Sequence, residues 1–356
     1  MTFRAAHIAR LLGLALIAWL ASGSLPVAVA HGVGAKARLA ARPHRANGAG
    51  GAVAWPGRPF APNSIWNRTV GAQAPLSPHS HAYVSEVVRQ VNDYGPWLNT
   101  YAYSVPVYLV PAGQRMARVT LDTWGPDLQD AFDAVPLPAN AQPAEGSDAQ
   151  LTVWQPSTNT MWEFWKLHRV RGRWHARWGG EMQNVSHNPG YFTHNATTND
   201  WGATATGLPL LGGLITTADL QRGYINHALA ISLVETAPRV WAWPAQRTDG
   251  NVFTPDVAQI PEGTRFRLDP RLNVAALHLT PLVRMLANAA QRYGIIVRDK
   301  SGAVSFYGQD PAVGQPSLWG TAFQGQYPNN LLRSFPWSRL QALASTTSCC
   351  WGPPPS

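Results

Sequence analysis

Short apolar stretches separated by proline and glycine are the feature that most limits how this chain can fold. The 356 residues include 30 prolines and 31 glycines, and apolar runs such as residues 106–111 and 227–234 lie between them. Short runs bounded by turn residues are typical of β-strands. We therefore predict a mainly β fold, a β-sandwich of jelly-roll type with a few packed helices.

Three segments have the pattern of those helices. Residues 80–94 and 280–293 each have one apolar face and are followed by a glycine, and residues 217–222 form a shorter candidate. Pro281 suits the first helical position, because the missing N–H of proline would have no partner there. The sequence thus predicts few helices among many strands.

The beginning and the end of the chain differ in composition from the rest. Residues 1–30 combine two arginines, an apolar run and a small-residue cleavage motif, which predicts a signal peptide and a secreted protein. Residues 31–54 are rich in alanine, glycine and arginine and are expected to form a disordered linker. We expect a single β-rich domain over residues 55–342 and a flexible C-terminal tail over residues 343–356.

The net charge of +9 is carried largely by the leader and linker. Six of the 28 Lys and Arg residues lie within residues 1–50, and all 19 Asp and Glu residues lie after them. The remainder is only mildly basic, so a nucleic-acid partner is not expected. No stretch after the leader is long and apolar enough to predict membrane insertion. The two cysteines are adjacent and do not form a disulfide framework.

Residues 161–182 place four tryptophans beside two glutamates and five Lys or Arg residues. Side chains alternate between the faces of a strand. On one predicted face, Trp162 and Phe164 pack against Trp174 and Trp178. The opposite face is expected to hold Glu163, Trp165, His175 and Arg177. A core built from tryptophan explains the stretch equally well. The alternative is a carbohydrate site, where an aromatic ring stacks on a sugar and charged groups bind hydroxyls.

The candidate catalytic residues are carboxylates. Glu163 is flanked by aromatic side chains, which would raise its pKa by desolvation and suit it to act as an acid or base. Glu181 is the candidate for the second carboxylate of a glycosidase pair, with Asp249 as an alternate. The competing interpretation makes Glu163 a solvated residue and Asp249 part of a turn.

Four further residues are candidates for a site. Trp66 and Asn67 could line it, although a turn that fixes the start of the domain explains them as well. Arg247 could pair with a substrate carboxylate. His227 could act as a general base or as a structural histidine. His227 and Arg247 together would serve a lyase that acts on a uronic acid.

No motif predicts a metal or a cofactor. The histidines at positions 175, 187 and 194 lack a tight ligand spacing. The Gly- and Thr-rich segment 199–216 lacks the Gly-Lys-Ser/Thr of a nucleotide loop, so we expect it to lie over a sheet edge.

Several segments resemble an uncharacterised family of secreted proteins, mostly from actinobacteria and related bacteria. The resemblance lies in "FAPNSIWN", "GATATGLPLLGGLIT", "WAWPAQRTDG" and "RYGIIVRDKSGAVSFY", and it covers roughly residues 59–342. It implies one exported domain and brings no reaction with it.

These observations lead to one principal hypothesis and two alternatives. The principal one is a secreted, monomeric carbohydrate-active enzyme that hydrolyses a polysaccharide or cell-wall glycan with paired carboxylates. The alternatives are a polysaccharide lyase and a non-catalytic protein that binds glycans in the cell envelope.

Overall fold

The computed structural model describes residues 53–192, 201–250, 258–311 and 316–349. Residues 1–30 and most of residues 31–54, the predicted leader and linker, lie outside these ranges. More residues lie in strands than in helices, which confirms the prediction of a mainly β chain with few helices. The helices are α1 Ser80–Tyr94, α2 Pro126–Phe132, α3 Thr217–Arg222, α4 Pro281–Arg292, α5 Trp319–Phe323 and α6 Pro328–Leu332.

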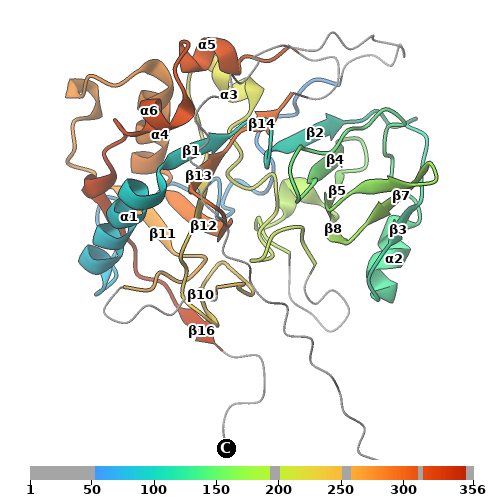
Figure 1. Cartoon of the computed structure of the whole chain (residues 1–356), viewed down its shortest axis with the longest axis horizontal. Helices are drawn as coiled ribbons and strands as arrows, with labels where there is room; N and C mark the ends of the chain where they lie inside the picture. The colour runs from blue at the N-terminus through green and yellow to red at the C-terminus, as the bar shows by residue number, and fades with distance from the viewer. Residues whose placement is uncertain (1–52, 193–200, 251–257, 312–315, 350–356) are drawn as a thin grey trace, which may run out of the picture. The chain divides into compact units, whose positions relative to one another are not determined.

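The largest sheet has six strands, in the order β1-β13-β9-β12-β11-β15. Its strands are β1 Pro96–Asn99, β13 Val304–Tyr307, β9 Leu229–Leu233, β12 Ile295–Lys300, β11 Arg265–Leu268 and β15 Leu340–Ala342. Helices α1, α4, α5 and α6 contribute apolar side chains to the core on one face of this sheet (Figure 1). The pairs β1–β13 and β9–β12 are parallel and the others are antiparallel.

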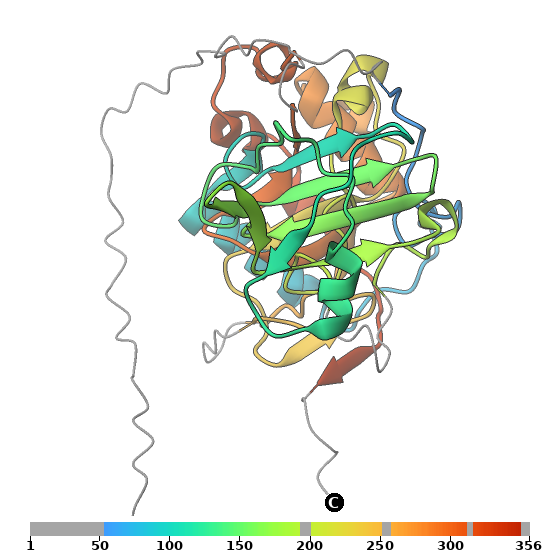
Figure 2. The ribbon, with the colours of Figure 1, turned by 90° about the vertical axis from the view of Figure 1, so that its right-hand side faces the viewer.

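A second sheet has five strands, in the order β14-β2-β4-β5-β8. Its strands are β14 Gln309–Asp310, β2 Val105–Leu109, β4 Leu151–Gln155, β5 Thr160–Trp165 and β8 Trp178–Met182. One face of it packs on helix α2 and on a small sheet of β3 Val119–Leu121, β7 Arg173–Ala176 and β6 His168–Val170 (Figure 2). Both large sheets contain parallel pairs, which distinguishes them from the antiparallel sheets of the expected jelly roll.

The tryptophan-rich stretch forms the predicted meander only in part. Strands β4 and β5 pair as an antiparallel hairpin, and Trp162 and Phe164 join the core on the α2 side, as expected. The third predicted strand is interrupted at Arg177, so β7 belongs to the small sheet and β8 to the five-stranded sheet. The interruption separates residues that a continuous strand would have kept on one face.

A third core joins the two large sheets. Val107 and Met161 of the five-stranded sheet and Ala230 and Ile296 of the six-stranded sheet belong to the same buried cluster. The cluster also contains leucines of the segment 201–216. This segment is therefore buried in the core between the sheets and does not lie over a sheet edge as the sequence analysis expected.

The C-terminal segment is paired as far as the structure describes it. Strand β16, Thr347–Cys349, forms an antiparallel pair with β10, Val240–Ala242, and the N–H of Leu343 donates to the carbonyl of Arg265. The predicted flexible tail thus has ordered partners over residues 343–349. Among the described residues, no helix combines the length and the apolar character needed to cross a membrane.

Candidate functional site

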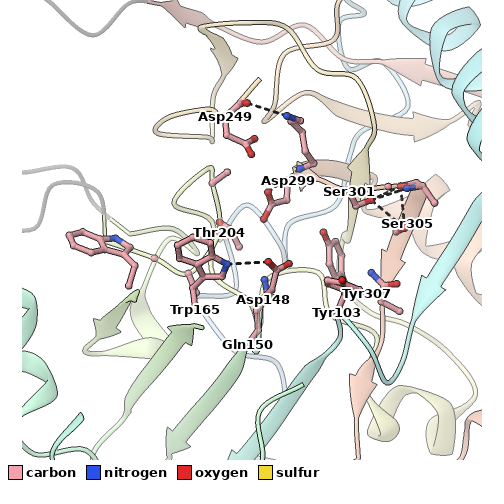
Figure 3. A pocket seen from close by; sticks show the side chains of 18 of the residues that line it. Tyr103, Asp148, Gln150, Trp165, Thr204, Asp249, Asp299, Ser301, Ser305 and Tyr307 are labelled. Atoms are coloured by element: carbon pink, nitrogen blue, oxygen red, sulfur yellow. Dashed lines mark hydrogen bonds between the residues drawn. The ribbon is translucent and has the colours of Figure 1, made fainter. Parts of the chain in front are cut away.

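A cleft of about 780 Å³ opens between the two large sheets. We call it the central cleft. It is lined by residues of β1, β12 and β13 from the six-stranded sheet, of β5 and β8 from the five-stranded sheet, and of the segment 201–216. Its volume falls within the range of about 300–1,000 Å³ found for small-molecule sites. Figure 3 shows its charged and aromatic side chains.

Aromatic side chains form much of the lining. They are Trp97, Tyr103, Trp165, Trp178 and Tyr307. Trp97 is 37% exposed and Tyr103 is 44% exposed, values that are high for such large apolar side chains. Exposed aromatic rings in a concave site can stack on the apolar face of a sugar ring.

One wall of the cleft presents the carboxylate of Asp148. Asp148 precedes β4 and lies beside Trp165 of β5, whose indole N–H donates to Asp148 Oδ1 at 3.2 Å. Figure 3 shows this bond and shows the carboxylate directed into the cavity. The bond orients the carboxylate toward the cleft.

The opposite wall carries three carboxylates, Asp249, Glu262 and Asp299, which we call the acidic wall. One oxygen from each lies within 4.8 Å of the other two. Asp249 and Asp299 line the cleft, and Glu262 is fully buried behind them. Burial, followed by the charge of Asp249, raises the pKa of Asp299 to about 7. Burial and the charges of Asp299 and Asp249 raise the pKa of Glu262 well above its ordinary range.

A β-bulge places Asp299 in the cleft. The register of β12 against β9 shifts between Val297 and Asp299, so Arg298 is an extra residue on β12. Strict alternation would place Arg298 and Asp299 on opposite faces. With the bulge, Arg298 packs on Tyr307, a cleft residue, and Asp299 also reaches the cleft. Bulges re-aim side chains in this way beside functional sites.

Three charged side chains hold the segment 201–216, of which Glu163 and Arg298 are buried and Arg247 is half-buried. Glu163 accepts the backbone N–H groups of Ala203 and Leu210 at 2.7 and 2.8 Å. Arg247 donates to the carbonyls of Trp201, Gly202 and Thr204, and Arg298 to those of Leu210 and Gly212. A buried irregular segment needs such partners, because its backbone groups have no strand or water to bond. Desolvation by burial raises the pKa of Glu163 to about 7, against the opposing effect of these N–H groups.

The structure brings together only some of the predicted site residues. Trp165, Arg247 and Asp249 line the central cleft. Glu163 is fully buried beneath it and bonds the segment 201–216. Glu181 lies on the other face of the same sheet, where Trp162 donates to it at 2.8 Å. Glu163 and Glu181 therefore do not face one another as a catalytic pair.

The expected grouping of Glu163 and Trp165 with His175 and Arg177 is wrong. His175 lies in the small sheet, and its Nδ1 is 2.8 Å from Asp122 Oδ1. Arg177 is exposed in the link between β7 and β8. The interruption of the third strand is the physical reason for the separation.

A second, much smaller cavity of about 20 Å³ is lined by Trp66, Asn67 and His227, among others. Trp66 and Asn67 bond backbone carbonyls: the indole of Trp66 bonds Gly190, and Asn67 bonds the turn of residues 59–61. Both ring nitrogens of His227 have partners, namely the carbonyl of Ala228 at 2.8 Å and Asp219 Oδ2 at 3.3 Å. The cavity holds about one water molecule, and the structure does not bring His227 to Arg247 as the lyase hypothesis requires.

The sequence analysis missed Asp148, Asp299 and Glu262. Asp148 lies in a polar loop and Glu262 in the turn "PEG", neither of which has a distinctive local pattern. The only usable signal was "RDK" at residues 298–300, where an otherwise apolar strand becomes charged.

Comparisons with known proteins bring no identification. No protein-family model, curated protein or solved structure matches the chain. The functional argument therefore rests on the cleft alone.

Proposed function

We propose that the protein is a secreted carbohydrate-active enzyme that hydrolyses a polysaccharide in the central cleft. The supporting observation is that carboxylates on two opposite walls face a cavity lined with aromatic rings, two of which, Trp97 and Tyr103, are exposed. The aromatic side chains provide stacking surfaces for sugar rings. The carboxylates provide the acidic groups that flank a glycosidic bond in most hydrolases.

Asp148 is the group that we assign to proton transfer or nucleophilic attack from the first wall. It faces the cavity, and its bond from Trp165 fixes its orientation. Asp249 and Asp299 of the acidic wall face the same cavity from the opposite side. Glu163 is assigned a positioning role, because it bonds the segment that lines the cleft and does not reach the cavity.

A substitution pair tests this assignment. The purified chain is incubated with a panel of bacterial and plant polysaccharides, and new reducing ends are measured. We expect Asp148→Asn to lower kcat/KM by about 100-fold or more, the usual contribution of an acid or base. Glu145→Gln is the matched control, since Glu145 is an exposed acid that bonds Tyr101 and lies outside the cleft lining.

The results separate the proposal from its alternatives. Hydrolysis that persists unchanged in Asp148→Asn would contradict the assignment of Asp148. A glycan-binding protein would be favoured if no hydrolysis occurred and the wild type were retained on an immobilised glycan. Trp165→Ala should then abolish this retention. Unsaturated products that the wild type and Asp148→Asn form equally well would favour a lyase.

A further inference from the structure

The three carboxylates of the acidic wall are close enough together to bind one metal ion. One oxygen from each of Asp249, Glu262 and Asp299 lies within 4.8 Å of the others. Calcium binds oxygen at about 2.3–2.6 Å, so two of its ligands can be up to about 5 Å apart. Magnesium binds oxygen at about 2.1 Å, which limits its ligands to about 4.2 Å. The bound of 4.8 Å on these separations lies within the range that calcium accepts and exceeds the limit for magnesium, so calcium is the ion that we test first.

A buried oxygen of Glu262 makes no hydrogen bond within 3.5 Å to the described part of the chain, although the Thr248 side chain is close enough to lower the pKa of the carboxyl group. Glu262 Oε2 accepts the backbone N–H of Asp249 at 3.3 Å, but Glu262 Oε1 is buried and has no such partner. Leaving a buried acceptor unsatisfied is costly, more so for a charged group. An oxygen of this kind beside two further carboxylates indicates a missing positive partner.

The described side chains do not supply that partner by direct ion pairing. Among residues 53–192, 201–250, 258–311 and 316–349, no salt bridge joins a Lys, Arg or His to Asp249, Glu262 or Asp299. Lys300 approaches the backbone carbonyl of Asp249 at 3.4 Å, and Arg298 donates to backbone carbonyls of the segment 201–216. The charge of Arg298 is close enough to oppose the rise in the pKa of Asp299.

The wall is also accessible from the cleft. Asp249 is exposed, Asp299 is half-buried, and Glu262 closes the back. A cation held by the three would keep coordination positions open toward the cavity. Water or sugar hydroxyls could fill these positions, as is usual for a hard cation with oxygen ligands.

We propose that Asp249, Glu262 and Asp299 bind a divalent cation, with Ca²⁺ as the preferred ion. The site joins the turn at Asp249, the turn at Glu262 and strand β12. The inference does not depend on the proposed hydrolysis, because it rests on the geometry of the wall.

Calorimetry tests the site directly. The purified chain is freed of metal with EDTA and titrated with CaCl₂ and, separately, with MgCl₂. We expect one Ca²⁺ per chain, tighter than Mg²⁺, and a higher unfolding temperature in its presence. Asp249→Asn should weaken Ca²⁺ binding by about tenfold or more, since even a second-shell partner contributes 10- to 100-fold. Glu145→Gln, an exposed acid outside the wall, should bind as the wild type does.

Asp249 is exposed, so its amide variant is expected to fold, and Asp299→Asn gives a second test at a more buried position. A folded wild-type chain that binds neither ion at millimolar concentration would overturn the proposal, as would unchanged binding by Asp249→Asn. The proposal would also be overturned if the wild type bound no metal and Asp299→Asn unfolded at a higher temperature than the wild type. That result would show that the carboxylates share protons. Tighter binding of Mg²⁺ would overturn the preference for Ca²⁺.

Discussion

Glu163 shows how one residue can be correctly placed on a strand face and still have an unexpected role. Alternation along β5 puts Glu163 and Trp165 on the same side, as predicted, and both point to the space between the sheets. Glu163 lies two residues deeper and meets the segment 201–216 instead of the cavity. The period of a strand gives the face of a side chain but not its depth, which depends on what packs there.

The first residue-scale prediction concerns the pH dependence of stability. The pKa of Glu163 is raised from 4.5 to about 7, so the folded chain retains a proton that the unfolded chain loses in this interval. The stability contributed by this group is therefore full below about pH 4.5 and falls as the pH rises to about 7, by about 1.4 kcal/mol per pKa unit. Glu163→Gln lacks this titration.

The measurement is urea unfolding of both proteins from pH 4.5 to 7.5. The free energy of unfolding of the wild type should decline relative to that of Glu163→Gln across the interval. The variant should lose about 1–3 kcal/mol through one unpaired backbone N–H. A difference that stays constant with pH would mean that Glu163 is ionised throughout.

At the scale of elements, turns and bulges position the acidic wall. Gly263 follows Glu262 with a φ of +88°, and a Cβ there would lie 1.7 Å from the carbonyl oxygen of Ala242. A side chain is therefore excluded by conformation and by space. The bulge at Arg298 likewise fixes the position of Asp299 in the wall.

We expect Gly263→Ala to lower the free energy of unfolding by about 2–4 kcal/mol, because the alanine needs both a strained backbone and displacement of β10. Gly113→Ala is the control, since its Cβ would meet nothing within 4 Å, and it should change stability by less than about 1 kcal/mol. Equal stabilities in denaturant titrations would show that the turn at Glu262 is not constrained.

Local signals predicted helices α1, α3 and α4 but missed α2, α5 and α6. Helix α1 covers Ser80–Tyr94, the predicted residues, and α4 covers Pro281–Arg292 within the predicted 280–293. Amphipathic spacing and a following glycine are properties of adjacent residues, so they can be identified in one sequence. The parallel pairing of β1 with β13 joins residues about 200 positions apart, and no local pattern encodes such a pairing.

At the scale of the molecule, the cleft results from two sheets that share one core along part of their length. Asp148 precedes a strand of the five-stranded sheet and Asp299 lies in the six-stranded sheet, and each was missed because its significance arises only when the sheets meet. Composition predicted the β class, and alternation predicted the face of Trp165. The site could not be predicted from the sequence, because it forms only in the tertiary structure. There the bulge, the buried segment 201–216 and the turn at Glu262 come together.

The most direct test of the central claim is a crystal structure of Asp148→Asn with oligosaccharides from the polysaccharide panel. We predict a sugar chain in the central cleft, with one ring against Trp165 and a glycosidic oxygen within hydrogen-bond distance of the side chain at position 148. Sugar bound only at another surface, with solvent alone between position 148 and the acidic wall, would contradict the account.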